Sequence, residues 1–226
     1  MTPEQLRERL RLYVVTDERA ALESLLDAVS AAIAGGATAI QLRRKADTGR
    51  SLVELGRIVR KLTRDASVLF FVNDRVDVAQ VVEADGIHVG QDDIAILDVR
   101  ALTHQSLLVG VSTRTADQAL AAERDGASYL GVGAIYPTVS KPDADWTGLE
   151  GLRAIRQSVS TPLVAIGGIH RGRVGDVLRA GADGIAVVSA VLSAQNPRIA
   201  AASLLDEVDG AVARGRTDNV KNGGTA

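Results

Sequence analysis

The sequence predicts an α/β protein built as a single (β/α)8 barrel, in which eight parallel strands alternate with helices. Eight short apolar runs are spaced along the 226 residues, and segments with helical periodicity lie between them. Most of the runs are continuously apolar rather than alternating, which is typical of parallel strands covered by helices. A chain of this length can bury the core of one such domain.

Most of the apolar runs are rich in β-branched residues, and each has the length of one strand. They are residues 12–15, 39–42, 68–72, 86–89, 107–111, 129–132, 163–166 and 185–188. Segments with helical spacing fall at residues 22–34, 52–63, 76–83, 94–102, 116–124, 149–157 and 173–180. In the second of these, Leu52, Leu55 and Val59 share one face and Arg57 and Arg60 lie opposite, as in an amphipathic helix packed on a sheet.

A weak internal repeat separates a helix from a strand at four places. Its members are residues 34–37, 83–86, 125–127 and 180–184, and each contains glycine. Glycine just past a helix end takes the left-handed cap conformation at little steric cost. The repeat therefore predicts helix-to-strand loops, which lie on the barrel face opposite the chemistry.

The two ends of the chain are expected to differ from the barrel units. Residues 2–9 predict a short helix covering the bottom of the barrel. Residues 217–226 are polar and rich in Gly and Asn, which predicts a disordered tail after one barrel domain at residues 1–216. The longest stretch without predicted structure, residues 135–148, is a loop of the length that is more often functional than incidental.

Composition and charge argue against several classes of protein. The 26 Lys and Arg against 28 Asp and Glu give a formal charge of −2, so nucleic acid and anionic membranes are not generally attracted. Aromatic residues make up 3% of the chain, which leaves few for base stacking. The absence of Cys excludes disulfides, thiolate metal sites and a cysteine nucleophile. With no signal peptide and no membrane-spanning run, we expect a cytoplasmic protein.

Cations follow the second predicted strand, and the C-terminal ends of all barrel strands meet on one face. Arg43 and Lys45 would both face this mouth, while Arg44 would point away into solvent. Arg offers a planar fork to phosphate oxygens and Lys offers a mobile charge. Lys141, on the long loop, would add a third cation; the alternative is an ordinary exposed lysine.

Two carboxylates follow neighbouring strands, Asp74 after the third and Asp93, or Asp92, after the fourth. Without thiolates or clustered histidines, such a pair favours Mg²⁺, which binds carboxylate and substrate phosphate oxygens. The alternative for each Asp is a helix N-cap. Because the two strands are adjacent and face the cations, we expect the pair to hold Mg²⁺.

The last two strands predict a phosphate site. Gly167 and Gly168 follow the seventh strand, and Val188 and Ser189 end the eighth. Barrels commonly bind a phosphate there through loop amides, and glycine lets the backbone approach an anion closely. The alternative is a simple pair of turn glycines. Ser112, which ends the fifth strand, is interpreted as a hydrogen-bonding residue, because no His partner is visible in the sequence.

Together these residues resemble the thiamine phosphate synthase family. The most specific stretches are residues 41–45 (Gln-x-Arg-x-Lys), 86–93 (Gly-x-His-x-Gly-Gln-x-Asp) and 137–141 (Pro-Thr-x-Ser-Lys), and the likeness runs from the first strand to the eighth. The resemblance implies a transferase that joins 4-amino-2-methyl-5-hydroxymethylpyrimidine diphosphate to hydroxyethylthiazole phosphate. Mg²⁺ would help the diphosphate leave, and the thiazole nitrogen would capture the pyrimidinylmethyl cation.

The resemblance also implies a role for each site residue. Asp74 and Asp93 would hold Mg²⁺. The pyrimidine diphosphate would be bound by Gln41, Arg43, Lys45, Asn73, Ser112 and Lys141, of which Arg43, Ser112 and Lys141 would take part in catalysis. The thiazole phosphate would be bound by Thr138, Ser140, Gly168, Val188 and Ser189.

Other functions stay open at this point. A relative of the same fold that isomerises or only binds the thiazole phosphate would need the late-strand phosphate site but no diphosphate and metal site. A ligand sensor would bind its ligands without turnover. A scaffold protein is disfavoured, because no long exposed apolar helix is visible. The oligomeric state is also open, and a homo-oligomer is compatible with the sequence.

Overall fold

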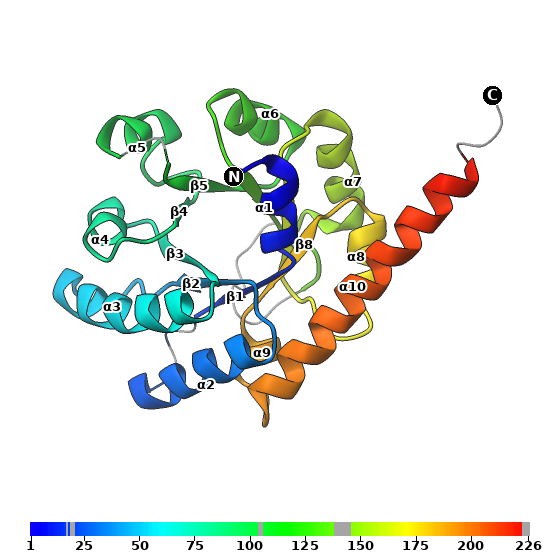
Figure 1. Ribbon diagram of the computed structural model, residues 1–226. Coiled ribbons are helices and arrows are strands. Elements are labelled where there is room, and N and C mark those ends of the chain that lie inside the picture. Colours follow the sequence, from blue (N-terminus) through cyan, green and yellow to red (C-terminus); the bar gives the residue numbers. More distant parts are fainter. Residues whose placement is uncertain (17, 19–20, 104–105, 138–145, 223–226) are drawn as a thin grey trace.

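Eight parallel strands close into a barrel in the order β1-β2-β3-β4-β5-β6-β7-β8, with β8 beside β1 (Figure 1). The structure, a computed structural model, describes residues 1–16, 18, 21–103, 106–137 and 146–222, with the backbone alone for residues 215–222. The predicted (β/α)8 barrel is confirmed.

The strands agree with the predicted apolar runs to within two residues at each end. They are β1 Leu12–Val15, β2 Ala39–Leu42, β3 Leu69–Asn73, β4 Gly86–Val89, β5 Leu108–Thr113, β6 Tyr129–Val132, β7 Leu163–Ile166 and β8 Gly184–Val187.

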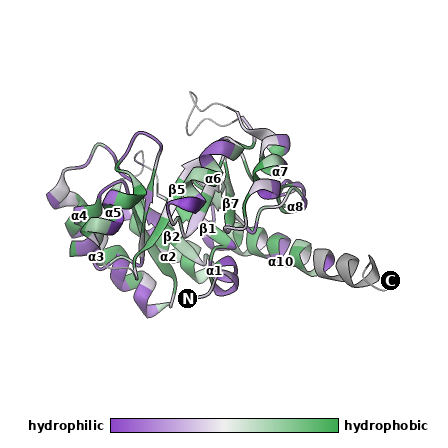
Figure 2. Ribbon diagram, turned by 90° about the horizontal axis from the view of Figure 1, so that it is seen from above, coloured by the Kyte–Doolittle hydropathy of each residue, from purple (hydrophilic) through white to green (hydrophobic). Residues whose placement is uncertain are grey.

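Helices surround the strands and cover one end of the barrel. They are α1 Pro3–Arg9, α2 Leu22–Ala34, α3 Gly49–Asp65, α4 Val76–Val81, α5 Ile96–Leu102, α6 Ala116–Arg124, α7 Gly148–Ser158, α8 Val174–Arg179, α9 Ser189–Leu192 and α10 Pro197–Asn222. Figure 2 shows hydrophobic and hydrophilic residues alternating along the outer helices, as amphipathic helices require.

Local sequence signals determine where several helices begin. At α1, the Thr2 side chain accepts from the Gln5 N–H (3.2 Å), the Gln5 side chain accepts from the Thr2 N–H (2.9 Å), and Pro3 is the first helical residue. Thr48 and Thr115 cap α3 and α6 with their side-chain oxygens. Figure 1 shows α1 lying across one end of the ring of strands, as the sequence predicts.

Two layers of apolar packing hold the barrel together. Strand residues alternate between them, so Leu12 and Val14 of β1 face the outer helices while Tyr13 faces the barrel interior. The interior cluster also contains Leu6 of α1 and Leu10, both nearly inaccessible to solvent. The barrel is therefore filled and closed at its N-terminal end, which leaves the C-terminal end for a site.

Residues in the predicted repeat, or directly after it, join the N-terminal ends of neighbouring strands by hydrogen bonds. Thr38, Asp85, Ser128 and Asp183 directly precede β2, β4, β6 and β8. Each side-chain oxygen accepts a backbone N–H from the preceding strand: those of Leu12 (3.0 Å), Phe70 (2.8 Å), Val109 (3.0 Å) and Leu163 (2.8 Å). The same contact thus recurs in four successive pairs of strands, at the end of the barrel that α1 covers.

Helix α10 packs along α2 and α8 and continues beyond the barrel (Figures 1 and 2). Its backbone is helical to Asn222, so the expected domain boundary at residue 216 falls inside the helix. Extending an existing helix adds one hydrogen bond per residue, which the polar composition of the segment does not reveal. Residues 223–226 lie outside the described residues, and tail disorder stays a prediction. In the described part of the chain, no helix is long and apolar enough to cross a membrane.

Candidate active site

A cavity of about 700 Å³ opens among the C-terminal ends of the strands. Its lining includes every predicted site residue that the structure describes: Gln41, Arg43, Lys45, Asn73, Asp74, Asp93, Ser112, Gly168, Val188 and Ser189. Thr138, Ser140 and Lys141 lie outside the described residues. Residues far apart in the chain therefore meet at one rim.

Two carboxylates and an ammonium group lie together in this cavity. Lys45 Nζ lies 2.8 Å from Asp74 Oδ2, the Asp74 and Asp93 carboxylates are close enough to share a hydrogen bond, and the Gly90 N–H donates to Asp93 Oδ2 at 2.8 Å. Burial raises the pKa of Asp74, and the neighbouring Asp93 raises it further, against the effect of Lys45. Two acidic groups in such contact suit a divalent cation, which would relieve their repulsion.

Burial also acts to raise the pKa of Asp93, but other contacts outweigh it. The Gly90 donor, the hydrogen bond with Asp74 and the positive charge of Lys45 hold the pKa of Asp93 below its ordinary value. Of the two carboxylates, Asp93 is therefore the one that stays ionised most readily.

The alternative that these aspartates are helix caps is not supported. The N-cap positions of α4 and α5 are Arg75 and Ala95, and neither helix has a side-chain cap. Asp74 instead has a left-handed backbone with φ 58°, which is uncommon for a residue with a Cβ. Its N–H donates to the His88 carbonyl at 2.9 Å, and this contact stabilises the turn that places Asp74 at the mouth.

The cations after β2 lie as the alternation of the strand predicts. Arg43 and Lys45 line the cavity, whereas Arg44 lies outside its lining and pairs with Asp47 at 2.7 Å. The Arg44 side chain is only 14% exposed, so the expectation that it is solvated is wrong. Glu18, which was not predicted from the sequence, also lines the cavity. It accepts from the Lys45 N–H and lies 3.8 Å from Arg43 Nη1. A single Glu after the first strand has no pattern that would have identified it.

A chain of hydrogen bonds crosses the barrel beneath the mouth. Gln41 Nε2 donates to Tyr13 Oη, Tyr13 Oη contacts Tyr129 Oη, Tyr129 Oη contacts His88 Nδ1, and His88 Nε2 contacts Ser112 Oγ, each at 2.9 Å. The interpretation that Ser112 has no His partner is therefore wrong. Inward-facing positions on the adjacent strands β4 and β5 were the signal that would have paired these two residues.

The loop after β7 is packed tightly against the loop after β6. Gly167 and Gly168 have φ values of 101° and 63°, and a Cβ on Gly168 would lie 2.6 Å from the Pro137 carbonyl oxygen. Arg173 Nη1 donates to the Gly168 carbonyl at 2.9 Å, and its guanidinium lies 4.4 Å from the centre of the Tyr136 ring. The glycine pair is thus required by turn geometry and close packing, and it also presents backbone to the cavity.

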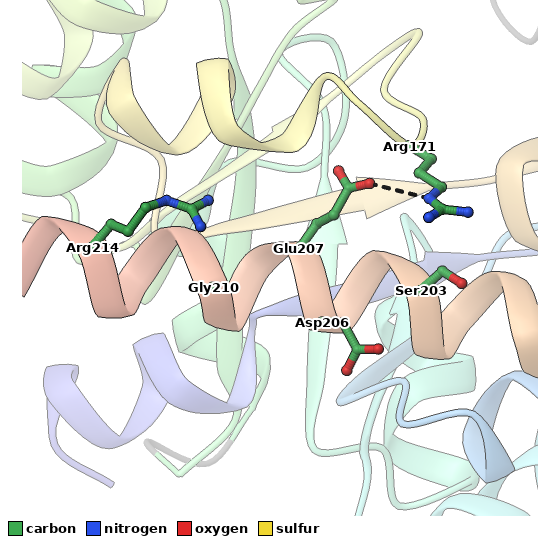
Figure 3. A pocket seen from close by; sticks show the side chains of 6 residues that line it. All are labelled: Arg171, Ser203, Asp206, Glu207, Gly210 and Arg214. Carbon is green, nitrogen blue, oxygen red and sulfur yellow. Dashed lines mark ion pairs between the residues drawn. The ribbon is translucent and has the colours of Figure 1, made fainter.

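A second, smaller hollow of about 280 Å³ lies on the outside of the barrel, between α10 and the loop after β7 (Figure 3). The Glu207 carboxylate accepts from the Gly172 N–H at 2.9 Å and lies 3.5 Å from Arg171 Nε. These charged groups fasten α10 to the barrel. The residues that suit phosphate and metal chemistry are at the mouth instead.

Comparisons with known proteins agree with this arrangement. Residues 12–191 match the family model for thiamine monophosphate synthase. The thiamine-phosphate synthase of Pyrococcus furiosus is 48% identical over 199 residues, 88% of this chain and 95% of that protein. That of Chloroflexus aurantiacus is 54% identical over 196 residues, 86% of this chain and 90% of that protein.

Solved structures agree as well. The thiamine phosphate pyrophosphorylase from Pyrococcus furiosus superposes with a TM-score of 0.83 at 44% identity, covering 91% of this chain and 98% of that one. A 3-hexulose-6-phosphate synthase, with a TM-score of 0.67 at 21% identity over 88% of this chain and 99% of that one, shares the fold alone.

Proposed function

The chain belongs to the thiamine monophosphate synthase family and is a transferase of thiamine biosynthesis, and we propose from this how its mouth performs the reaction. It joins 4-amino-2-methyl-5-hydroxymethylpyrimidine diphosphate to hydroxyethylthiazole phosphate and releases diphosphate. The observation that supports this is the meeting of carboxylates, cations and a glycine loop in one cavity of about 700 Å³. Both substrates are phosphorylated small molecules, and the cysteine-free composition suits the cytoplasm as their place of reaction.

The diphosphate of the pyrimidine substrate is bound by Arg43, Lys45 and Asn73, with Lys141 from the long loop. Breaking the carbon–oxygen bond leaves extra negative charge on the departing diphosphate. Cations already fixed in the cavity stabilise this charge as it develops, without reorganising at the moment of reaction. The Lys45 contact to Asp74 at 2.8 Å holds one of these cations in place.

The donor set at the mouth fits a hard divalent cation, because two carboxylates lie side by side with a raised pKa on Asp74. Asp74 and Asp93 would hold Mg²⁺, which when bound supplies further positive charge to the leaving diphosphate. The lowered pKa of Asp93 favours its ionised form, which is the form that binds a metal. The Gly90 N–H orients the Asp93 carboxylate by donating to Oδ2.

The thiazole phosphate is bound at the other side of the cavity by Gly168, Val188 and Ser189, together with Thr138 and Ser140. The thiazole nitrogen is a neutral nucleophile, so no protein base has to remove a proton from it. What the chain supplies is position: both substrates are held in one cavity, which converts a bimolecular encounter into a reaction between neighbours.

The alternatives make different demands on the site. A protein that only isomerises or binds the thiazole phosphate has no use for Arg43, Lys45, Asp74 and Asp93 in the same cavity as Gly168. A ligand sensor would bind both substrates but would not turn them over, so single-turnover mixing of the two substrates separates it from the synthase.

The test of the proposed function is product formation by the purified full chain. With both substrates and Mg²⁺, we expect thiamine phosphate and diphosphate to appear in equal amounts. Exhaustive chelation should stop turnover, and added Mg²⁺ should restore it. Turnover undiminished by chelation would defeat the metal assignment, and binding of both substrates without product would defeat the synthase.

A further inference from the structure

The hydrogen-bond chain beneath the mouth carries an inference that rests on the proposed function and concerns substrate choice. We propose that Tyr13, Tyr129 and His88 are positioning residues that fix the direction of each hydrogen bond in the chain. Gln41 then presents an acceptor to the pyrimidine and Ser112 presents a donor. This pattern selects a 4-aminopyrimidine over its 4-oxo counterpart.

Packing holds the members of the chain in one arrangement. Tyr13 and Tyr129 are fully buried, and their ring centroids lie 5.2 and 5.3 Å from that of Phe71. A Cβ on Gly110 would lie 2.1 Å from the Tyr129 ring, and a Cβ on Gly131 would lie 2.9 Å from His88 Cε1. The barrel interior is thus shaped around these rings, and they have little room for other rotamers.

Each tyrosine keeps a single proton to donate. Burial raises the pKa of Tyr13 despite its hydrogen bonds, and burial together with the neighbouring Tyr13 raises the pKa of Tyr129. Both hydroxyls are therefore neutral at neutral pH. A neutral hydroxyl gives one hydrogen bond and can accept others.

The direction of the chain follows from its first member. Gln41 Nε2 donates to Tyr13, which leaves Tyr129 Oη as the acceptor for the Tyr13 proton, and a buried hydroxyl proton without an acceptor would be costly. In the arrangement we propose, the Tyr129 proton then goes to His88 Nδ1. His88 then carries its proton on Nε2 and donates it to Ser112 Oγ. Each link in the chain fixes the next, so no member can reverse alone.

The hydrogen-bond chain ends at Gln41 and Ser112, and these two side chains can contact the substrate. Within the described residues, Gln41 Oε1 and the Ser112 hydroxyl proton have no partner, and both residues line the cavity. A 4-aminopyrimidine offers an amino donor beside a ring-nitrogen acceptor, which matches Gln41 Oε1 and the Ser112 proton. A 4-oxopyrimidine offers an acceptor beside an N–H donor, which matches neither.

Accommodating the 4-oxo compound would require Gln41 to rotate its amide. That rotation places Oε1 against Tyr13, so Tyr13, Tyr129 and the His88 tautomer would all have to reverse. A site with buried polar groups rejects a mismatched analogue strongly, because those groups lose their partners. Interrupting the chain should free Gln41 to rotate and should relax the selection.

The experiment compares kcat/KM for the 4-amino and 4-oxo pyrimidine diphosphates in the full chain. We expect the wild-type enzyme to prefer the amino compound by about 10³-fold or more. In Tyr129→Phe and Tyr13→Phe the preference should fall at least roughly tenfold, with a raised KM for the pyrimidine and an unchanged KM for the thiazole phosphate. A preference that stays at the wild-type value, or equal losses with both compounds, would overturn the proposal.

Thr113→Val is the matched control. The Thr113 hydroxyl is buried beside Ser112 on β5 and lacks a hydrogen-bond partner among the described residues, so its loss should leave the preference unchanged. An equal fall in preference in this variant would show that deleting any buried hydroxyl has this effect. That result would contradict the proposal that the hydrogen-bond chain sets the preference.

A second measurement is made on the wild-type protein and uses a variant only to assign signals. In protein labelled with ¹⁵N-histidine, His88 should show a protonated Nε2 and an unprotonated Nδ1, and His88→Gln identifies its signals among the three histidines. A proton on Nδ1 would overturn the direction of the chain. Failure of the proposed function is distinct from both results, because wild-type protein would then form no product with either pyrimidine.

Discussion

The two ends of the barrel are built in different ways. At the N-terminal end, one contact recurs: a side-chain oxygen before β2, β4, β6 and β8 accepts a backbone N–H of the preceding strand. At the C-terminal end, the strands are followed by unlike residues, among them Asp74 with a left-handed backbone and Asp93 beside it. Repetition at one end and local strain at the other indicate that stability and chemistry are separated along the barrel axis.

Substitutions at the two ends are expected to affect different properties of the protein. At the covered end, Asp183 accepts the Leu163 N–H at 2.8 Å and pairs with Arg7 at 3.0 Å and Arg156 at 3.3 Å, so its charge is fully compensated. At the open end, Asp74 is half-buried next to a second carboxylate. Substitutions at the covered end should therefore lower the free energy of unfolding, and those at the open end should lower activity.

The largest expected effect is on activity at the open end. Asp93→Asn should reduce kcat by about 10²–10³-fold, because it removes one of the two carboxylates that would hold Mg²⁺ against the leaving diphosphate. The thermal midpoint should change little, since a loop carboxylate contributes little to core packing. Steady-state kinetics with matched thermal unfolding check this. Asp92→Asn is the neighbouring control, and a greater loss in that variant would move the metal ligand to Asp92.

A smaller difference is expected between two residues of the diphosphate site. Lys141→Ala should lower kcat/KM more than Ser112→Ala, because a charge-assisted hydrogen bond is about twice as strong as a neutral one. The Ser112 variant should lose roughly tenfold. Kinetics with the pyrimidine diphosphate as the varied substrate give the order, and a reversed order would show that the roles are misassigned.

At the covered end, Asp183→Ala should lower the free energy of unfolding by about 2 kcal/mol, because it leaves the Leu163 N–H and two guanidinium groups without their acceptor. Urea unfolding measures this, and kcat/KM of the folded variant should stay at the wild-type value. The control is Asp176→Ala, whose half-exposed pair with Arg179 should contribute under about 1 kcal/mol. Loss of activity in the folded Asp183 variant would contradict the separation of the two ends.

The smallest expected effect is a gain of stability at the open end. The pKa of Asp74 is raised in the folded protein, so its protonated form is favoured there, and stability of the metal-free protein should fall as pH rises through that pKa. Asp74→Asn mimics the protonated form and tolerates the left-handed backbone. At neutral pH without metal, the free energy of unfolding of this variant should be about 1 kcal/mol higher than that of the wild type, and the variant should lose activity. A destabilised Asp74→Asn protein would argue against an energetic cost of the charged Asp74 carboxylate beside Asp93.

The same contrast explains what the sequence could predict. The strands follow from continuous β-branched runs, and the covered end from glycines that end helices, because both are local signals. Arg43, Asp74 and Asp93 could be brought to one mouth because parallel strands in a barrel share a C-terminal face. These predictions needed the order of the elements but not their register.

Other features depend on three-dimensional detail. The pairing of His88 with Ser112 requires the register of β4 against β5, in which His88 lies opposite Gly110. The burial of Arg44 against Asp47 depends on the path of a loop, and so does the position of Glu18 in the cavity lining. For Arg44 and Glu18, neither residue type nor spacing carries that information. For His88 and Ser112, the sequence places both on adjacent strands, and the register then brings them into contact.

A structure of the protein with thiamine phosphate, diphosphate and Mg²⁺ bound would show whether both substrates react at the mouth of the barrel. We expect diphosphate against Arg43 and Lys45, Mg²⁺ held by Asp74 and Asp93, and the thiazole phosphate at Gly168 and Ser189. Diphosphate bound away from this mouth, with Asp74 and Asp93 touching neither metal nor ligand, would contradict this expectation.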